Sequence, residues 1–253
     1  MNYKQFEDNI FAEWRKRSVA NGDGCELASD GLLYRGRFVY KDGYWSREPG
    51  NENAIWERAK RRVLILTKDL NDEEAWDIRA ETGRNNFSGE NNVVVSAPFY
   101  KNLMRWVYGL LTIDANGHAK KFAEIDRQDV YRPFYDQAPV TRVNCKKQVG
   151  KSSIETSVLK SYMERYKDLL VKQISAYDAN ILLCCGASGA IKDFVAENYL
   201  TDLLKLNNWV YYSPQTRKMV IDSWHPTYTG DTHEKMYSDM MSGVEEAWSR
   251  IKL

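Results

Sequence analysis

The feature of the sequence that most constrains its fold is a short apolar run, Val-Leu-Ile-Leu, at residues 63–66. The run contains two β-branched residues and no polar one, which is typical of a strand buried on both faces of a parallel sheet. Polar residues follow immediately at positions 67–69, 71 and 72, with Asp69 among them. Because open α/β sheets bind ligands beyond the carboxyl ends of their strands, we expect Asp69 to lie at a functional site.

Further strand-like and helix-like segments complete an α/β pattern. Strands are predicted at residues 138–144 and 180–185, and two more flank the Ser-Pro-Gln-Thr turn at 213–216. Apolar residues at helical spacing predict amphipathic helices near 99–110, 158–174 and 236–251. Helices that alternate with buried strands are typical of a parallel sheet covered on both faces. We therefore predict a three-layer α/β/α fold around a central, mainly parallel four-stranded sheet.

The length of 253 residues fits one domain, and we assign residues 1–253 to a single unit. Within it, residues 1–60 are expected to form an N-terminal elaboration made of a helix and a β-hairpin. The helix is predicted from the helical spacing of Phe6, Ile10 and Trp14. The hairpin is predicted from an Asp-Gly turn at Asp42 between alternating aromatic and polar residues.

Charge and cysteine content limit the possible functions. The formal net charge of +1 gives no whole-molecule attraction to nucleic acid, so such binding would need a local basic face. No Cys-x-x-Cys pair and no histidine at ligand spacing accompany the four cysteines, so we expect reduced core thiols and no metal site. These are Cys25, Cys145, Cys184 and Cys185. Because no apolar stretch approaches the ~20 residues that span a membrane, we expect a cytoplasmic protein that does not bind membranes. As a separate expectation, we take the protein to be a monomer.

Residues that can carry chemistry follow four of the predicted strands: Asp69, Asn144, the Gly-Ala-Ser-Gly segment 186–189, and His225. If these strands are parallel, all four groups lie at one edge of the sheet. Each also has a simpler explanation, since such residues commonly cap helices, satisfy loop backbone or bond to neighbours. Segment 186–189 can offer backbone N–H groups to a phosphate, but it has neither the ending of a P-loop nor the spacing of a nucleophile elbow.

The loop after Asn144 is the most basic in the chain, with Lys146, Lys147 and Lys151 followed by two serines. Such a loop is either a solvated surface segment or a contact for phosphate groups. The sequence leaves both interpretations open.

Taken in order, these motifs resemble the uracil-DNA glycosylase superfamily. The resemblance runs from about residue 63 to residue 229. It includes Asp69, Phe87, Ala-Pro-Phe-Tyr-Lys-Asn at 97–102, Asn144, Gly-Ala-Ser at 186–188 and His-Pro-Thr at 225–227. The first motif of that family reads Gly-Gln-Asp-Pro-Tyr-His. The corresponding residues 67–72 are Thr-Lys-Asp-Leu-Asn-Asp, which retain only the aspartate.

The resemblance implies a DNA-binding, base-flipping enzyme that hydrolyses the N-glycosidic bond of uracil or a related modified base. It implies that Asp69 orients the attacking water and stabilises the positively charged sugar, and that a neutral His225 donates to the base. The residues implied to bind the base are Phe87, Asn144, Lys68 and Asn71. Those implied to contact phosphates and DNA are Ser96, Pro98, Lys146, Lys147, Ser188, Thr227 and Tyr228, the last as a wedge into the base stack.

The sequence also departs from the pattern of that family. Asn71 stands where the family has the tyrosine that excludes thymine, and Thr67 and Leu70 replace the glycine and proline that shape this loop. Two alternatives therefore stay open. One is a catalytically inactive nucleic-acid- or nucleotide-binding protein with the same fold, and the other is an enzyme that acts on a free nucleoside or another small glycoside. Because the cysteines lack the spacing of the iron–sulfur branch, we expect no cofactor.

Overall fold

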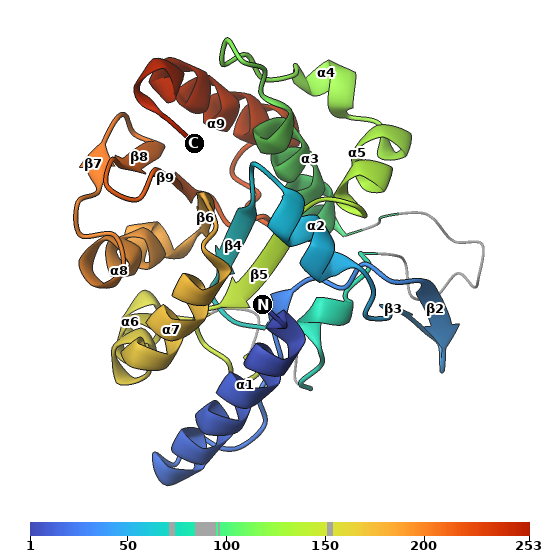
Figure 1. Cartoon of the computed structure of the whole chain (residues 1–253), viewed down its shortest axis with the longest axis vertical. Helices are drawn as coiled ribbons and strands as arrows, with labels where there is room; N and C mark the ends of the chain where they lie inside the picture. Colours follow the sequence, from blue (N-terminus) through green and yellow to red (C-terminus); the bar gives the residue numbers. More distant parts are fainter. Residues whose placement is uncertain (71–73, 84–94, 96, 151–153) are drawn as a thin grey trace.

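A seven-stranded sheet forms the middle layer of the protein in a computed structural model that describes residues 1–70, 74–83, 95, 97–150 and 154–253 (Figure 1). Within these residues the strand order is β1-β5-β4-β6-β9-β8-β7. The strands are β1 (Gly31–Leu32), β4 (Val63–Thr67), β5 (Val140–Asn144), β6 (Ile181–Cys185), β7 (Leu204–Lys205), β8 (Val210–Ser213) and β9 (Lys218–Ser223).

Four central strands, β5, β4, β6 and β9, run parallel to one another. The predicted α/β class with a mainly parallel sheet is therefore confirmed, but the expectation of a four-stranded sheet is wrong. β1 pairs antiparallel with β5 at one edge, and β8 and then β7 add antiparallel strands beyond β9. β1 and β7 have two residues each, so neither is long enough to show a period in the sequence.

Strand β4 supplies side chains to both halves of the core. All five of its residues are buried. Leu64 and Leu66 belong to one hydrophobic cluster, whereas Val63 and Ile65 belong to the other. Because full burial of one such side chain contributes ~1.5–3 kcal/mol, this single run stabilises the packing on both faces of the sheet.

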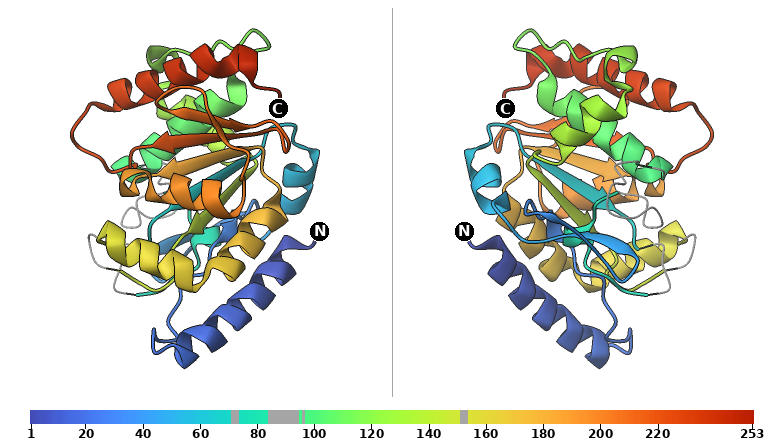
Figure 2. Two further views of the ribbon diagram at one scale, coloured as in Figure 1. Left: turned by 90° about the vertical axis from the view of Figure 1, so that its left-hand side faces the viewer. Right: turned by 90° about the vertical axis from the view of Figure 1, so that its right-hand side faces the viewer.

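Helices form the two outer layers, which the edge-on views in Figure 2 separate. One layer contains α1 (Tyr3–Ala20), α2 (Glu52–Arg58), α6 (Thr156–Arg165), α7 (Lys167–Tyr177) and α8 (Ala190–Asn198). The other contains α3 (Pro98–Thr112), α4 (Phe122–Ile125), α5 (Gln128–Tyr135) and α9 (His233–Ala247). Short 3-10 segments occur at η1 (Ile78–Ala80), η2 (Ala187–Gly189) and η3 (Trp248–Arg250).

The single helix predicted near 158–174 is two helices, α6 and α7. The break is at Tyr166, whose φ of −112° and ψ of 21° are not helical. Its ring stacks on Trp14 with centroids 5.9 Å apart, and its hydroxyl donates to Asp23 at 2.6 Å. These contacts hold Tyr166 outside the helical conformation, and apolar periodicity alone does not reveal them.

The first 60 residues are packed into the core. α1 lies against α7, and β1 extends the central sheet. The predicted hairpin is confirmed as β2 (Phe38–Lys41) and β3 (Tyr44–Arg47), which form a separate two-stranded sheet. Asp42 and Gly43 have φ values of 54° and 83°, and a type I′ hairpin turn needs positive φ at both central positions.

One of the four cysteines is not a core thiol. Cys145, Cys184 and Cys185 are buried, as predicted, whereas Cys25 is exposed. Cys25 lies just after α1, between turn residues and β1, where the backbone runs over the surface.

The connections between strands place a topological switch point at the carboxyl end of β4. The chain leaves β4 toward the layer of α3, whereas it leaves the neighbouring strands β5 and β6 toward the layer of α6 and α8. Adjacent strands whose connections depart to opposite faces open a crevice at their ends, where ligands of such sheets bind. Among the described residues, no helix has the length and apolar character needed to cross a membrane.

Candidate functional site

Asp69 lies two residues beyond β4, in a segment that stays paired with the segment after β5. The N–H groups of Lys146 and Gly150 donate to the carbonyls of Lys68 and Leu70 at 2.8 and 2.9 Å. The Asp69 carboxylate packs directly on Gly150, because a Cβ atom there would come within 2.2 Å of Oδ2. A glycine at position 150 therefore makes room for this carboxylate.

The Asp69 carboxylate is mostly removed from water. Its side chain is 8% exposed, and Nζ of Lys146 lies 3.8 Å from Oδ2. Burial raises the pKa of Asp69, and the charges of Lys146 and Lys68 partly oppose this effect. A carboxylate in this setting has strong electrostatic interactions with any charge that develops beside it.

Asn144 is the last residue of β5 and is completely buried. Its backbone N–H donates to Oδ2 of Asp30 at 2.8 Å, and its Oδ1 accepts a hydrogen bond of 2.5 Å from the Thr67 hydroxyl. Its Nδ2 is buried and has no hydrogen-bond partner among the described residues. An unpaired buried donor costs about 1–3 kcal/mol, so this amide is available for a ligand that carries an acceptor.

His225 follows β9 and is held by a residue two positions later. Its Nδ1 accepts from the backbone N–H of Thr227 at 3.3 Å and lies 2.7 Å from the Thr227 hydroxyl. Because a backbone N–H can only donate, Nδ1 is unprotonated and the ring proton of a neutral His225 is on Nε2. Burial, together with the charges of Lys68 and Arg142, lowers the pKa of His225 to about 4. His225 is therefore a neutral donor at neutral pH.

Two other elements fix the loop that carries His225. Nδ2 of Asn102, on α3, donates to the carbonyl of Pro226 at 2.7 Å. Gly186, with φ of +79°, lies so close that a Cβ atom there would be 3.0 Å from Cβ of His225. The ring of Phe99 packs against the imidazole with centroids 5.9 Å apart. The ends of β6 and β9 and the start of α3 thus meet at this histidine.

Arg142 is a residue of the site that sequence reasoning missed. It lies in β5, its guanidinium is 4.5 Å from the centre of the Phe99 ring, and it forms a buried ion pair with Glu81. Its charge contributes to the low pKa of His225. The available signal was a charged residue in the middle of an otherwise uncharged buried strand, since arginine is almost never fully buried unless paired.

The positive charge of Lys68 acts on both Asp69 and His225 and favours a lower pKa for each. The side chain of Asn144 is hydrogen-bonded to Thr67, which precedes Lys68 in the chain. Asp69, Asn144 and His225 lie at or just after the ends of the parallel strands β4, β5 and β9, so the structure places all three at the carboxyl edge of the sheet. Phe87, Asn71 and Ser96 lie outside the described residues.

The predicted contact of Lys147 with phosphate is wrong. Its side chain is 0% exposed, and its Nζ donates to Asp30 at 2.7 Å and to Gln173 at 2.8 Å. Consecutive residues of an extended segment point to opposite sides, so Lys147 turns inward while Lys146 turns toward Asp69. The inward position also stacks the ammonium over the ring of Trp14, 4.8 Å from its centre.

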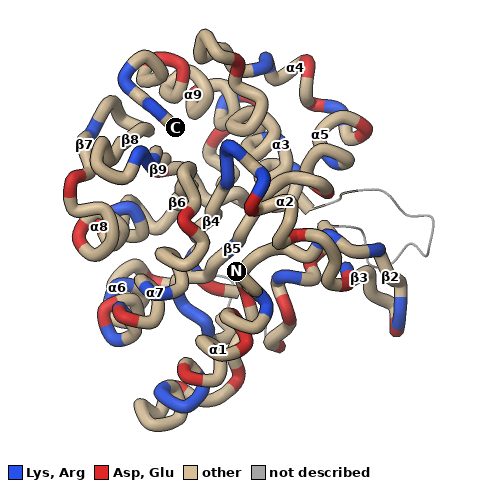
Figure 3. Tube along the Cα trace, in the orientation of Figure 1, with Lys and Arg blue, Asp and Glu red and all other residues tan. Residues whose placement is uncertain are grey.

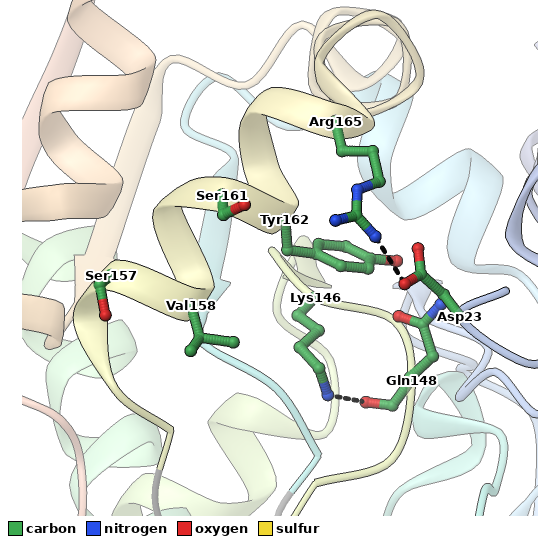
Figure 4. Close-up of a pocket in the computed structure, with 8 residues that line it drawn as sticks. All are labelled: Asp23, Lys146, Gln148, Ser157, Val158, Ser161, Tyr162 and Arg165. Atoms are coloured by element: carbon green, nitrogen blue, oxygen red, sulfur yellow. Dashed lines mark hydrogen bonds and ion pairs between the residues drawn. The ribbon is translucent and has the colours of Figure 1, made fainter. Parts of the chain in front are cut away.

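Lys146 is partly buried and already has polar partners. Its Nζ donates to the carbonyls of Gln148 and Val149 at 3.0 and 3.1 Å. Figure 4 shows it in the wall of a cavity of about 440 Å³ between α6 and the segment after β5. Ser157 and Ser161 line the opposite wall, and Arg165 at the far end is paired with Asp23 at 2.6 Å. The cavity offers hydroxyl groups and one side of Lys146 to a polar ligand.

The other residues proposed to contact phosphate are at the surface of the same edge. Ser188 is exposed in η2 with φ of 49°, between Ala187 and Gly189, which also have positive φ. The Asp222 carboxylate lies beside Gly189, where a Cβ atom would be 3.4 Å from Oδ2, and its charge opposes an anion at the start of α8. Lys and Arg are interspersed with Asp and Glu over the described part of the chain (Figure 3), so phosphates would be held by individual groups.

Three more of the expected contact residues lie in the two segments that carry His225 and Phe99. Pro98 is exposed at the first position of α3, and Thr227 is exposed while its hydroxyl lies against the imidazole. Tyr228 is 43% exposed, and its ring stacks on Trp224 with centroids 6.2 Å apart and planes 12° apart. An exposed aromatic ring with a rigid backing is a suitable wedge for a base stack.

The sequence matches no protein-family model and no curated protein. Among the described residues, no group of three or more histidine, cysteine or carboxylate side chains is placed to hold a metal ion. The chemistry of the site is therefore argued from its own residues: one buried carboxylate, one buried amide donor and one neutral imidazole donor.

Proposed function

We propose that the protein is a DNA N-glycosylase that hydrolyses the N-glycosidic bond of uracil or a related modified base. The observation that carries this proposal is the buried, unpartnered Nδ2 of Asn144, at the same edge as a neutral His225 and a buried Asp69. A flipped base with a carbonyl group would satisfy this donor.

The two donors suit the leaving group of the reaction. Cleavage of the N-glycosidic bond leaves negative charge on the base and positive charge on the sugar. In our proposal Nε2 of His225 donates to the base oxygen that gains charge, and Asn144 holds a second acceptor of the base. Because both groups are fixed by Thr67 and Thr227 before the ligand binds, little reorganisation is needed as charge develops.

Asp69 suits the sugar side of the reaction. In our proposal its carboxylate stabilises the oxocarbenium-like sugar and orients the attacking water. Burial strengthens this interaction, because the carboxylate is poorly screened by solvent. Gly150 holds the group in place from behind.

The test is the formation of abasic sites in labelled oligonucleotides that carry one uracil, both single-stranded and paired, read by alkaline cleavage on a gel. We expect cleavage by the unchanged protein and a loss of about 10²–10⁴-fold in Asp69→Asn and in His225→Ala. Asp129→Asn is the matched control, because it removes an exposed carboxylate that forms an ion pair with Arg127 at the surface. Equal rates in Asp69→Asn and Asp129→Asn would contradict the assignment.

A second function is favoured by one contact, the approach of Lys146 to Asp69 at 3.8 Å. A carboxylate whose charge is balanced by an ammonium group stabilises a cationic sugar less well, which suits a protein that binds nucleic acid without cleaving it. This candidate predicts no abasic sites with any base, but a gel shift that weakens as salt rises. Hydrolysis of free uridine without cleavage of DNA would instead indicate a nucleoside-directed enzyme.

A further inference from the structure

One face of α6 lines the cavity of about 440 Å³ that Figure 4 shows in close-up. Ser157, Ser161 and Arg165 recur at intervals of four residues along this helix, so they lie on the same side of it. Lys146 and Gln148, in the segment after β5, form the facing wall. The volume falls within the range of small-molecule sites, ~300–1,000 Å³.

Gln148 brings an unpaired acceptor to this cavity. The residue is 8% exposed, its backbone forms a β-bridge with Leu27, and its Nε2 donates to the Ser18 hydroxyl at 2.6 Å. Its Oε1 is buried and has no hydrogen-bond partner among the described residues. In Figure 4 this oxygen points toward the side of the cavity where Tyr162 and Lys146 lie. Because a buried acceptor without a donor is unfavourable, a ligand that carries an N–H or O–H group gains a contact here.

The charged residues in the walls already have partners of opposite charge. Among the described lining residues these are Asp23, Lys146 and Arg165. Arg165 contacts Asp23 at 2.6 Å, and Nζ of Lys146 lies 3.8 Å from Asp69. The same ammonium group also donates to two backbone carbonyls of its own segment. An ion that entered the cavity would lose its water without gaining an unpaired partner, so these walls favour an uncharged ligand.

The remaining lining groups combine hydroxyls with apolar surface. Ser157 and Ser161 are exposed, and each hydroxyl can donate one hydrogen bond and accept others. Beside them, Val158 is 51% exposed, and the ring of Tyr162 forms part of the same wall. A ligand that matches these walls has hydrogen-bonding groups around its edge and apolar C–H groups on its faces.

We propose that this cavity binds a neutral polyol of the monosaccharide class. A sugar ring carries hydroxyl groups around its edge, so one of them donates to Oε1 of Gln148 while others pair with Ser157 and Ser161. The C–H groups on its faces pack on Val158 and Tyr162 and are removed from water. The proposal does not rest on the glycosylase activity, although Lys146 borders both sites, because the binding is measured without DNA.

The test is isothermal titration calorimetry of the full chain with D-glucose, D-galactose and D-mannose, which place the same hydroxyl groups differently around one ring. The cyclic ether 2-(hydroxymethyl)tetrahydropyran keeps that ring without its ring hydroxyls, and D-glucuronate keeps the ring hydroxyls and adds a negative charge. We expect saturable binding of at least one hexose, about tenfold tighter than binding of the ether and tighter than binding of glucuronate. No hexose binding, equal affinity for hexose and ether, or tighter binding of glucuronate would overturn the proposal.

Variants assign the binding to this cavity. Ser161→Ala removes a hydroxyl at an exposed position of α6, and Ser238→Ala makes the same change on α9, in the opposite outer layer. Gln148→Met removes the unpaired acceptor. We expect hexose binding to be about 2–10-fold weaker in Ser161→Ala and in Gln148→Met, and unchanged in Ser238→Ala.

A variant that fills the cavity keeps the proposal testable if Gln148→Met does not fold. Ser161→Trp places a large ring in the cavity from an exposed position and should abolish hexose binding. The thermal unfolding of each variant shows that it is folded. Full hexose affinity in a folded Ser161→Trp would place the sugar elsewhere and refute this site.

Discussion

The Thr67 hydroxyl donates a 2.5 Å hydrogen bond to Oδ1 of Asn144 and so joins the ends of the two neighbouring strands β4 and β5. In this arrangement Oδ1 of Asn144 accepts from the Thr67 hydroxyl. With Oδ1 engaged by Thr67, Nδ2 is the group left for a ligand. Thr67, which looks like a simple strand terminus in the sequence, is therefore a direct partner of the Asn144 side chain.

Replacing Thr67 by valine tests this relationship, because valine keeps the shape and removes the donor. We expect Thr67→Val to lose about 1–3 kcal/mol of unfolding free energy, since a buried acceptor loses its partner. Thr141→Val is the matched control, because the Thr141 hydroxyl is buried in the adjacent strand with no hydrogen-bond partner among the described residues. Urea unfolding measures both. Equal losses in the two variants would show that the bond to Asn144 is not special.

The pKa of His225 gives a second prediction. Burial, Lys68 and Arg142 lower it from the ordinary 6.5 to about 4, so NMR titration of the ring should show a midpoint near pH 4. Because Lys68 disfavours the charged ring, Lys68→Met should move the midpoint upward. An unchanged midpoint in Lys68→Met would show that the charge of Lys68 does not act on His225.

The lowered pKa of His225 also determines the direction in which the stability of the fold changes with pH. Between pH 4 and 6.5 the unfolded chain binds more protons at His225 than the folded protein does. The contribution of His225 is therefore fully present above pH 6.5 and is lost as the pH falls toward 4. The difference in unfolding free energy between the unchanged protein and His225→Gln should vary with pH only in this window.

Glu7 gives a prediction of opposite sign. Burial raises its pKa from 4.5 to about 7, although it accepts hydrogen bonds from the Leu32 N–H and the Tyr177 hydroxyl. The folded protein then binds more protons than the unfolded chain between these values, so stability should fall as pH rises from 4.5 to 7. Glu7→Gln keeps an acceptor and should remove this fall in pH-dependent urea unfolding. An unchanged pH profile in Glu7→Gln would exclude Glu7 as its source.

The sequence predicted those strands, turns and helices whose signal lies within a few neighbouring residues. The run at Val63, the Asp-Gly turn at Asp42 and the periodic helices all have a signal within a few residues. Local patterns did not predict the burial of Lys147. Its partner Asp30 is 117 residues away, and nothing near Lys147 in the sequence indicates that the side chain is buried. Arg142 and Glu81 are a similar case, separated by 61 residues. Long-range pairs of charges decide which polar residues of the site face the ligand and which are buried.

The buried pair of Lys147 and Asp30 predicts a large stability effect. Lys147→Met leaves the Asp30 carboxylate buried without a positive charge, and loss of one partner of such a pair costs about 3–5 kcal/mol. Lys160→Met is the control, because Lys160 is exposed on α6 and such surface changes stay within about 0.5 kcal/mol. Urea unfolding at neutral pH measures the difference. Similar small losses in both variants would contradict the burial of Lys147.

The contact between Gly150 and Asp69 gives the last prediction. An alanine at position 150 would place Cβ within 2.2 Å of Oδ2 of Asp69, so the carboxylate must move. We expect Gly150→Ala to destabilise the fold by about 1–3 kcal/mol and, if the glycosylase proposal holds, to slow base excision by about 10²-fold. In the double variant with Asp69→Ala this clash is absent. The new Cβ atom would also lie 2.9 Å from the Leu70 carbonyl oxygen, and the cycle of single and double variants separates the clash with Asp69 from that second contact. Strict additivity of the two stability losses would show that the carboxylate does not rest on Gly150.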